Sequence, residues 1–459
     1  MDSYGYRLDC SPYLGGALEA KILLERLPAR KDKLHDLTAG FEGGIYNGPQ
    51  FIRRYVDSPT FGVPFMTGSS LRVADTSELP LLSKLDALGP KLRHLEIKPG
   101  MSLISCSGTI GIMAYARQDM AGVWSSQDVL KVVADPTRIP PGYLYAYLCS
   151  KFGIPLVASG TYGAIIQHLE PEHIANLPVP RLKARLEWET HILVEQAATL
   201  RVDAAQRFGN AVRELEERAG LPSAEELSHL PHPPVVEVGS SKLQERLDTN
   251  FHRSYHYNAL QPYLTHRVKG RTVESLASSI LEPTRFKRVE HANQDFGVPF
   301  FGTGSLGDID PQPLYRIAPF PQIDQYRVDE RSVLIPRSGQ IYGIIGRAFQ
   351  PIGKVLTSAV TEDAIRITCK TAEEAGFVFL ALRSECGLRQ LKARCFGGSI
   401  PHLDVTHVGR VLVPDLEPGV RHRLGELAGH VLDLRTQAIN KEASAREMIE
   451  QAIEAGVKD

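Results

Sequence analysis

FGVPF occurs twice in the chain, at residues 61–65 and 296–300, which are 235 positions apart. The first copy is followed by MTGSSL and the second by FGTGSL, so a strand-like run leads into a short polar turn with glycine both times. One five-letter match can arise by chance. The sequence on either side therefore decides whether the chain repeats itself.

Three further blocks recur in the same order around FGVPF. They are RLD at 7–9 and 246–248, ISCSGTIG at 104–111 with IPRSGQIYG at 335–343, and YGAIIQHLEPEHIANLPVP at 162–180 with FGGSIPHLDVTHVGRVLVP at 396–414. Each block recurs 231 to 239 positions later. This period is far longer than that of solenoid repeats, so the sequence predicts a tandem duplication of whole domains.

A long amphipathic pattern follows the last block in each half. The first apolar stripe consists of Leu193, Ala197, Leu200, Ala204, Phe208, Ala211 and Leu215, and the second of Leu424, Leu427, Val431, Leu434, Ala438, Ala445, Met448 and Ala452. Lys441 interrupts the second stripe. Stripes this narrow are typical of a coiled-coil seam, and the alternative is two ordinary amphipathic helices packed on their own domains.

The remaining segments predict mixed α/β domains. VLKVVA at 129–134 and AIRITCK at 364–370 have strand-like content, whereas YLYAYLCSKFG at 143–153 and FVFLALRSECG at 377–387 predict short helices ended by glycine. We therefore expect an α/β (α+β) fold with two tandem domains at 1–180 and 246–414, long helices at 181–219 and 415–459, and a linker at 220–245 that is rich in Pro, Gly, Ser and Glu.

Composition narrows the class of protein. The 459 residues are too many for one ordinary domain, and 43% hydrophobic with 23% charged residues is typical of a globular protein. No window approaches the roughly 18 apolar residues that span a bilayer, and no signal-peptide pattern begins the sequence, so we expect a cytoplasmic protein without membrane contact. The six cysteines form no C-x2-C pair, so we expect no zinc site.

The four blocks together resemble the specificity subunit of type I restriction-modification systems over essentially the whole chain. RLD near the start of each half, VPF before a polar turn, LEIKPGMSLISCSGTIG at 95–111, and the block that ends in LPVP or VLVP before each long helix carry the resemblance. The resemblance implies two target-recognition domains that each read one half of a split double-stranded DNA target. It also implies that the long helices pair as an antiparallel coiled coil that spaces the two domains.

The same resemblance implies a subunit without catalytic activity or cofactor. Its implied partners are two DNA methyltransferase subunits, which translocase-nuclease subunits join. Two related but diverged readers on a rigid spacer also suit a bipartite, asymmetric target on physical grounds, because the protein then sets the separation of the half-sites. The net charge of −1 argues mildly against a nucleic-acid binder, although a neutral total can include a basic face.

Polar, glycine-rich turns at matching places in both halves are the candidate DNA contacts, because glycine lets backbones approach and Ser, Thr, Gln and Arg can bond to base edges or phosphates. In the first half they are Thr67, Ser69, Ser70, Arg72, Ser105, Ser107, Thr109, Thr161, Tyr162 and Gln167. In the second half they are Thr303, Ser305, Arg337, Ser338, Gln340, Tyr342, Arg394, Phe396 and Ser399. Shared residues also fit a structural role, so divergent positions, such as Thr109 against Gln340, are better candidates for base reading.

Basic clusters add further candidates for phosphate contacts, with a solvated surface as the alternative. They are Arg53 with Arg54, Arg285 with Lys287 and Arg288, and Arg389 with Lys392. His168 and His402 precede a leucine in both halves and fit structural histidines better than ligands.

Catalytic interpretations fail when the two halves are compared. FFGTG at 300–304 resembles the F-x-G-x-G turn of DNA methyltransferases, but the other half has FMTGS and no Asn-Pro-Pro-aromatic motif occurs. LEIK at 95–98 fits part of a nuclease pattern, whereas the second half has YRVDE, and no P-loop, H-E-x-x-H or G-x-S-x-G occurs. The remaining alternative is a non-catalytic assembly or scaffold protein of a defence complex that binds protein only.

Overall fold

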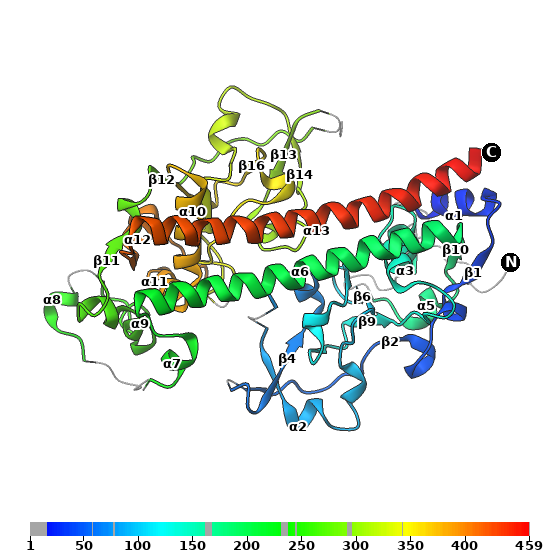
Figure 1. Ribbon diagram of the computed structural model, residues 1–459, viewed down its shortest axis with the longest axis horizontal. Helices are drawn as coiled ribbons and strands as arrows, with labels where there is room; N and C mark the ends of the chain where they lie inside the picture. Colours follow the sequence, from blue (N-terminus) through cyan, green and yellow to red (C-terminus); the bar gives the residue numbers. More distant parts are fainter. Residues whose placement is uncertain are drawn as a thin grey trace. The chain divides into compact units, whose positions relative to one another are not determined.

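The computed structural model describes residues 16–56, 58–76, 79–160, 168–230, 237–243, 246–291, 296–341 and 343–458 (Figure 1). The chain divides into two compact units, which we call unit 1 (Met1–Val202 with Gln437–Asp459) and unit 2 (Asp203–Thr436). The two long helices, α6 (Ala184–Ala219) and α13 (Pro418–Lys458), each contribute one segment to unit 1 and one to unit 2. Each unit is therefore built from a globular body and parts of both long helices.

The described residues of unit 1 form two four-stranded sheets and one ribbon. The first sheet is antiparallel and has the order β2-β9-β6-β7, from β2 (Ile45–Tyr46), β9 (Val129–Val132), β6 (Ser102–Ser105) and β7 (Met113–Tyr115). The second sheet has the order β3-β5-β4-β8, from β3 (Tyr55–Val56), β5 (Leu81–Ser83), β4 (Gly62–Met66) and β8 (Trp124–Ser125). The ribbon pairs β1 (Lys31–Lys33) with β10 (Pro178–Pro180).

Unit 2 repeats this arrangement. One sheet has the order β12-β17-β15, from β12 (Ser279–Leu281), β17 (Ala364–Thr368) and β15 (Ser332–Pro336), and the other has the order β14-β13-β16, from β14 (Tyr315–Ile317), β13 (Val298–Phe301) and β16 (Ala359–Val360). A ribbon pairs β11 (Gly270–Thr272) with β18 (Leu412–Pro414). The FGVPF strand lies parallel to a short strand in both units, with Phe65 opposite Trp124 and Phe300 opposite Ala359.

Short helices occur in both units. Unit 1 has α1 (Ala17–Arg26), α2 (Lys84–Ala87), α3 (Pro141–Leu148), α4 (Gly153–Ser159) and α5 (Pro171–Ala175). Unit 2 has α7 (Ala224–Ser228), α8 (Ser240–Leu243), α9 (Ser254–Leu264), α10 (Ala372–Arg383), α11 (Glu385–Ala393) and α12 (Val405–Gly409). The predicted α/β class is confirmed.

The glycines that were expected to end helices instead lie at the start of the next helix. A Cβ on Gly153 would lie 2.2 Å from the carbonyl oxygen of Tyr147, and one on Gly387 would lie 2.1 Å from that of Ala381. In both units a serine hydroxyl accepts the glycine N–H, at 3.1 Å for Ser150 and 3.2 Å for Ser384, and Ser384 is the N-cap of α11. Glycine is therefore required for the close approach of consecutive helices, and its interpretation as a helix end was wrong.

The long helices are stabilised by burial in both hydrophobic cores. In unit 1, Val194 and Ala198 of α6 and Ile449 and Ile453 of α13 pack among the residues of α1 and α3. In unit 2, residues 204–215 of α6 and 424–431 of α13 contribute to a core that includes α10. Because isolated helices gain little stability in water, this burial of one face in each unit accounts for their length.

The buried faces of the long helices differ partly from the predicted stripes. Leu193 and Leu200 are only half-buried, whereas Val194, Ala198 and Arg201 are buried, and on α13 the buried residues Ile449 and Ile453 replace Met448 and Ala452. Lys441 does not interrupt the buried face, because it donates to the Oε1 of Gln196 while its neighbour Glu442 is buried. The seam therefore includes charged residues that an apolar pattern cannot find.

Candidate nucleic-acid interface

Three loops of unit 1 meet beside the strand of the FGVPF motif. The N–H of Ser126 donates to Met66 O (2.8 Å), and the N–H of Cys106 donates to Asp128 O (3.0 Å). A Cβ on Gly68 would lie 3.3 Å from Asp128 O and 3.5 Å from the Cβ of Ser105. The turn after β4, the turn after β6 and the segment 126–128 therefore form one cluster, which we call the loop frame of unit 1.

The same backbone hydrogen bonds build a loop frame in unit 2. The N–H of Thr361 donates to Phe301 O (2.9 Å), and the N–H of Arg337 donates to Asp363 O (2.9 Å). In unit 1 the N–H of Leu169 donates to Cys106 O, and in unit 2 that of Leu403 donates to Arg337 O. Short bridges between Ser107 and His168 and between Ser338 and His402 also correspond. The duplication therefore extends to individual backbone contacts.

Some candidate residues of unit 1 hold these turns. The hydroxyls of Thr67 and Ser70 lie 3.0 Å apart in a capping box, and Ser69 is exposed beside them. Ser105 is buried, and its hydroxyl donates to Thr109 O (2.6 Å) and accepts from the N–H of Ile112 (3.0 Å).

The other first-half candidates differ in exposure. The side chains of Arg72 and Thr109 are exposed, and Ser107 is half-buried. Thr161, Tyr162 and Gln167 lie outside the described residues.

The candidates of unit 2 are divided in the same way. Thr303 and Ser305 are half-buried in the turn after β13, and Ser338 donates its hydroxyl hydrogen to Asp363. Gln340 is exposed and donates from Nε2 to Ser399 O (3.2 Å), so the structure brings these two predicted residues together. Tyr342 lies outside the described residues.

Three other candidates of unit 2 have partners within the domain. Arg337 forms an ion pair with Glu282, and the backbone of Phe396 exchanges hydrogen bonds with that of His402. Arg394 is buried, and its Nη2 donates to Arg410 O (3.4 Å). These contacts favour a structural role for Arg394 and for the backbone of Phe396.

The basic clusters contain both surface and interior side chains. Arg54 pairs with Asp86 (Nε to Oδ2, 2.9 Å), and this hydrogen bond lowers the pKa of the Asp86 carboxyl. Arg389 is buried and pairs with Glu385 (2.6 Å), while Lys392 donates to the carbonyl oxygens of Ile341 and Gly343 and supports the turn at 337–343. Arg285 and Lys287 are exposed.

The acidic segment of each loop frame was not predicted. It consists of Ser126, Gln127 and Asp128 in unit 1 and of Thr361, Glu362 and Asp363 in unit 2. Two arginines of the predicted basic clusters bind to it, since Arg53 donates to Asp128 (2.9 Å) and Arg288 donates to Glu362 (2.7 Å). A signal was present in the sequence, because both arginines and both acidic segments recur at 235 positions.

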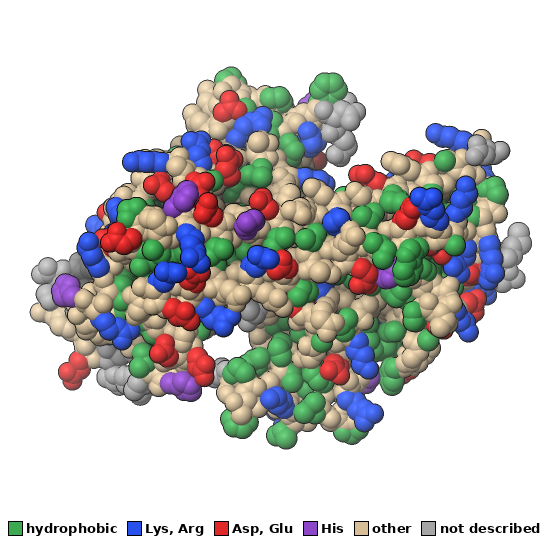
Figure 2. All heavy atoms as spheres, in the orientation of Figure 1, with side chains coloured by type: hydrophobic (Ala, Val, Ile, Leu, Met, Phe, Trp, Pro, Cys, Tyr) green, Lys and Arg blue, Asp and Glu red, His purple; other side chains and the backbone are tan. Residues whose placement is uncertain are grey.

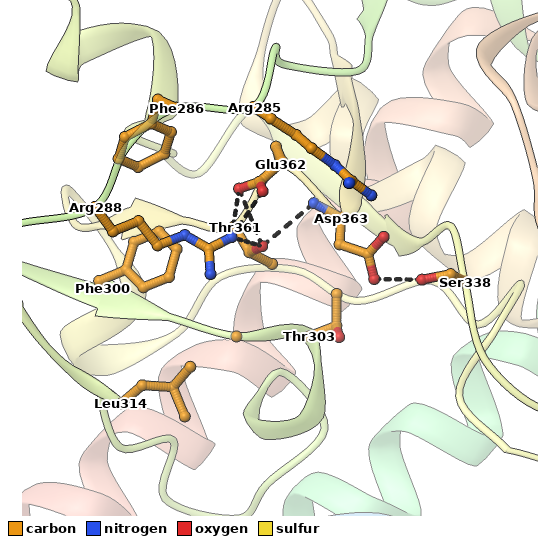
Figure 3. Close-up of a pocket in the computed structure, with 11 residues that line it drawn as sticks. Arg285, Phe286, Arg288, Phe300, Thr303, Leu314, Ser338, Thr361, Glu362 and Asp363 are labelled. Atoms are coloured by element: carbon orange, nitrogen blue, oxygen red, sulfur yellow. Dashed lines mark hydrogen bonds and ion pairs between the residues drawn. The ribbon is translucent and has the colours of Figure 1, made fainter.

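Arg288 and Glu362 line a pocket of about 630 Å³ in unit 2 (Figure 3). Arg285, Thr303, Ser338 and Asp363 also line the pocket, and Figure 3 shows Glu362 between the side chains of Arg285 and Arg288. With Thr361, which also lines it, the pocket combines two guanidinium groups, two carboxylates and three hydroxyls. Such a set can donate to and accept from the edges of a polar ligand.

A cation is buried on an inner strand of one sheet in each unit. Lys131 on β9 is fully buried and donates to Val129 O (3.1 Å), and burial lowers the pKa of its ammonium group to about 7. Arg366 on β17 donates to Val360 O (2.6 Å), and burial lowers its pKa to about 10. These cations lie in the interior, so their matched positions indicate a shared fold.

The surface carries charge of both signs and an apolar patch in unit 1. Figure 2 shows basic and acidic side chains interspersed on the visible face, and hydrophobic side chains gathered over the segment that contains α2. In unit 1, Ile52 and Leu85 are 86% and 88% exposed, and Phe61 and Leu88 are also exposed. Ile52 and Leu85 line one pocket, and we call these two residues the apolar patch of unit 1.

No helix in the described part of the chain is both long and apolar enough to cross a membrane. No three His, Cys, Asp or Glu side chains there are grouped so that they could hold a metal ion.

No protein-family model matches the chain, and a search of curated proteins found no match. Solved structures similar to it include the S subunit of a type I restriction-modification system from M. genitalium, with 14% identity, coverage of 94% of this chain and 96% of that one, and a TM-score of 0.32. The HsdS subunit from Thermoanaerobacter tengcongensis has 15% identity, coverage of 94% and 97%, and a TM-score of 0.27.

A third similar chain comes from a structural description of complex assembly and conformational transition of the type I R-M system. Its identity is 14%, its coverage is 94% of this chain and 97% of that chain, and its TM-score is 0.29. The matches extend over nearly the full length of each chain. At these TM-scores the superpositions are loose, and they decide nothing about function.

Proposed function

We propose that this chain is the DNA sequence-specificity subunit of a restriction-modification complex and directs a partner methyltransferase to a bipartite target. Unit 1 and unit 2 would each read one half of the double-stranded site. The observation that carries the proposal is the doubled loop frame, in which the same backbone hydrogen bonds hold the same loops in both units. A recognition domain copied within one chain would keep such a frame while its reading residues diverge.

The side chains on the two loop frames do diverge. Thr109 corresponds to Gln340, Cys106 to Arg337, and Gln127 to Glu362. Each exchange alters the set of donors and acceptors, which is the property that distinguishes base pairs in the major groove. Constant backbone with different polar side chains therefore suits two readers of unlike half-sites.

The candidate DNA contacts divide into side chains that reach the surface and side chains that are buried. We keep in the proposal the side chains that reach the surface or the pocket, and assign Ser105 and Arg394 to holding the loops because both are buried. The proposed contacts are Thr67, Ser69, Ser70, Arg72, Ser107 and Thr109 in unit 1, and Thr303, Ser305, Arg337, Ser338, Gln340, Phe396 and Ser399 in unit 2. Thr161, Tyr162, Gln167 and Tyr342 stay predictions from the sequence.

We further propose that α6 and α13 pair as an antiparallel coiled coil that acts as the spacer. In unit 1, Arg201 pairs with Glu442. In unit 2, Glu214 lies 3.4 Å from Arg423, and the guanidinium of Arg435 lies 5.6 Å from the ring centroid of Phe208. Within unit 2, the residue nearer the C-terminus of α6 contacts the residue nearer the N-terminus of α13, which supports an antiparallel pairing. A rigid spacer would fix the distance between half-sites.

The organisation and partners of the chain follow from this proposal. Residues 1–180 and 246–414 would be the recognition domains, 181–219 and 415–459 the spacer helices, and 220–245 the linker. Two methyltransferase subunits would bind the spacer and the adjoining domain faces, and translocase-nuclease subunits would join them. The chain itself would recognise DNA in the cytoplasm without catalysing a reaction.

Crosslinking in cells tests the proposal without any assumption about the partner. The full chain is crosslinked to DNA in its own cells, and the bound fragments are sequenced. We expect two short sequence blocks separated by a constant number of base pairs. Fragments without a shared sequence, or with one contiguous block, would contradict a two-headed reader.

A second candidate function, protein assembly without DNA reading, is favoured by the apolar patch of unit 1. Side chains as exposed as Ile52 and Leu85 commonly mark protein contacts when they are grouped. This function predicts no shared sequence in the crosslinked DNA. It also predicts that Leu85→Lys disrupts the complex while substitutions in the loop frames have no effect.

A further inference from the structure

In each unit one arginine is held over a buried phenylalanine by the acidic segment of the loop frame. Nη2 of Arg288 donates to both carboxylate oxygens of Glu362 (2.7 and 2.8 Å), and the guanidinium carbon lies 4.8 Å from the ring centroid of Phe300. Nη2 of Arg53 donates to Asp128 (2.9 Å) and to Gln127 Oε1 (3.2 Å), and its guanidinium carbon lies 5.6 Å from the ring centroid of Phe65.

These two arginine sites are copies of one arrangement. Arg53 and Arg288, Phe65 and Phe300, and the two acidic segments all recur at the same interval of 235 positions. Phe65 and Phe300 have no exposed surface, so the ring beneath each arginine is fixed by the core. A guanidinium held by a carboxylate on one edge and a ring on its face loses little conformational freedom when it binds a ligand.

Both guanidinium groups reach the surface. The side chains of Arg53 and Arg288 are 28% and 34% exposed, while Glu362 is nearly buried. The contact with the acidic segment uses Nη2, one of three guanidinium nitrogens, and Arg288 also hydrogen-bonds to the side chain of Tyr315. In unit 2 the arginine borders the pocket that Thr303, Ser338 and Asp363 also line (Figure 3).

The charges around Arg288 favour a base edge over a phosphate. A phosphate on Arg288 would lie close to the carboxylates of Glu362 and Asp363, and like charges at such distances repel strongly when they are partly shielded from water. Guanine instead offers two neutral acceptors, O6 and N7, that match an arginine fork, and its partner cytosine offers an amino group that a carboxylate accepts. A G·C pair therefore satisfies both signs of charge in the pocket.

We propose that Arg53 and Arg288 each recognise the guanine of one G·C pair, in the half-site that their own unit reads. The inference rests on the proposed function and adds the reading residue and the base to it. Asp128 and Glu362 position the arginines. Gln127 in unit 1 corresponds to Glu362 in unit 2, so the residues beside the two arginines differ. Lys287 beside Arg288 is exposed. As a candidate phosphate contact it is the matched control for the loss of a positive charge, which would lower occupancy without changing the base preference of either block.

Bound DNA is mapped by crosslinking in cells that carry the full chain as wild type, Arg53→Ala, Arg288→Ala or Lys287→Ala. We expect Arg288→Ala to lower the preference for guanine at one position of one block by roughly 5- to 150-fold and to leave the other block unchanged. Arg53→Ala should act in the same way on the other block. Lys287→Ala should keep both blocks.

The outcomes separate this inference from the proposed function. If the wild-type chain selects no two-block sequence, the proposed function fails. If it selects one and the arginine variants keep every base preference, or lower occupancy evenly at all sites as a lost phosphate contact would, only this inference is overturned. Circular dichroism of each purified variant checks folding. If Arg288→Ala is unfolded, Arg288→Lys decides, since it keeps the charge without the fork, and an unchanged guanine preference in that variant overturns the inference.

Discussion

The ion pair between Arg201 and Glu442 offers a direct test of how α6 and α13 are joined in unit 1. The two side chains are only 7% and 6% exposed, and Nη2 of Arg201 lies 3.0 Å from Oε2 of Glu442. Arg201→Met leaves a carboxylate buried without its cation, which costs about 3–5 kcal/mol in comparable cases. Glu442→Leu should cost a similar amount for the converse reason.

The double variant Arg201→Met/Glu442→Leu removes both charges and places apolar side chains of similar size in the seam. Replacement of a whole buried ion pair in this way is often neutral or stabilising by about 1–4 kcal/mol. We therefore expect the double variant to recover the loss of either single variant. The difference between the double variant and the sum of the singles should be several kcal/mol.

Tryptophan fluorescence during urea unfolding measures this in unit 1. The chain has two tryptophans, Trp124 and Trp188, and both belong to unit 1. With a slope of about 2–3 kcal/mol per molar urea, each single variant should lower the midpoint by roughly 1–2 M. Arg185→Met is the matched control, because Arg185 lies on the same helix, is 88% exposed and pairs with Glu189 one turn away. It should change stability by less than about 0.5 kcal/mol.

The pairing would be refuted by either of two results. The single variants could shift the midpoint no more than Arg185→Met does, which means that the charges are not buried together. Alternatively, the double variant could lose as much stability as both singles combined, which means that the two residues act independently.

Three further predictions concern other parts of the chain. The pKa of Lys131 is lowered from 10.5 to about 7 in the folded protein, so folding releases its proton between these values and unit 1 should lose stability as the pH falls from about 10.5 to 7. Lys131→Met should flatten this dependence of stability on pH in tryptophan-monitored unfolding, and should raise stability at pH 7 by at most about 4 kcal/mol. An unchanged pH dependence in this variant would contradict the buried ammonium. Gly387→Ala should lower the stability of unit 2 by about 1–3 kcal/mol, because the added Cβ would clash with the carbonyl oxygen of Ala381. Gly209→Ala in α6 should raise stability by up to about 1 kcal/mol, because the space around this glycine is open. Thermal unfolding followed by circular dichroism compares the two variants. Gln340→Ala should relax the sequence preference in one half-site only, and crosslinked-DNA mapping that finds both halves altered, or neither, would count against base reading by this residue.

The duplication was predictable from the sequence because short motifs kept their order and spacing. FGVPF and the blocks around it marked the strand and turns that the structure repeats, and the mixed α/β class followed from the same segments. The position of the helices was also predictable, since apolar residues recur every three or four positions. The duplication depends on the order of motifs and the helices depend on local periodicity, and a single sequence displays both.

Contacts between distant residues were harder to predict. Glu442 and Arg201 lie in the seam although neither is apolar, and a buried ion pair is visible only once both helices are in place. The role of Gly153 and Gly387 depends on the approach of a neighbouring helix, so the alternative reading as a helix end was equally consistent with the sequence. The acidic segments at 126–128 and 361–363 have neither the glycine nor the basic residues that mark the other turns, although both contain an aspartate at matching positions.

Genome-wide mapping of methylated bases, in cells with and without this chain, tests the proposed specificity most directly. If the chain directs a methyltransferase to a bipartite target, cells without it should lose methylation at one split motif and at no other sequence. Re-expression of the wild-type chain should restore the same motif. An identical methylation pattern with and without the chain would contradict the account.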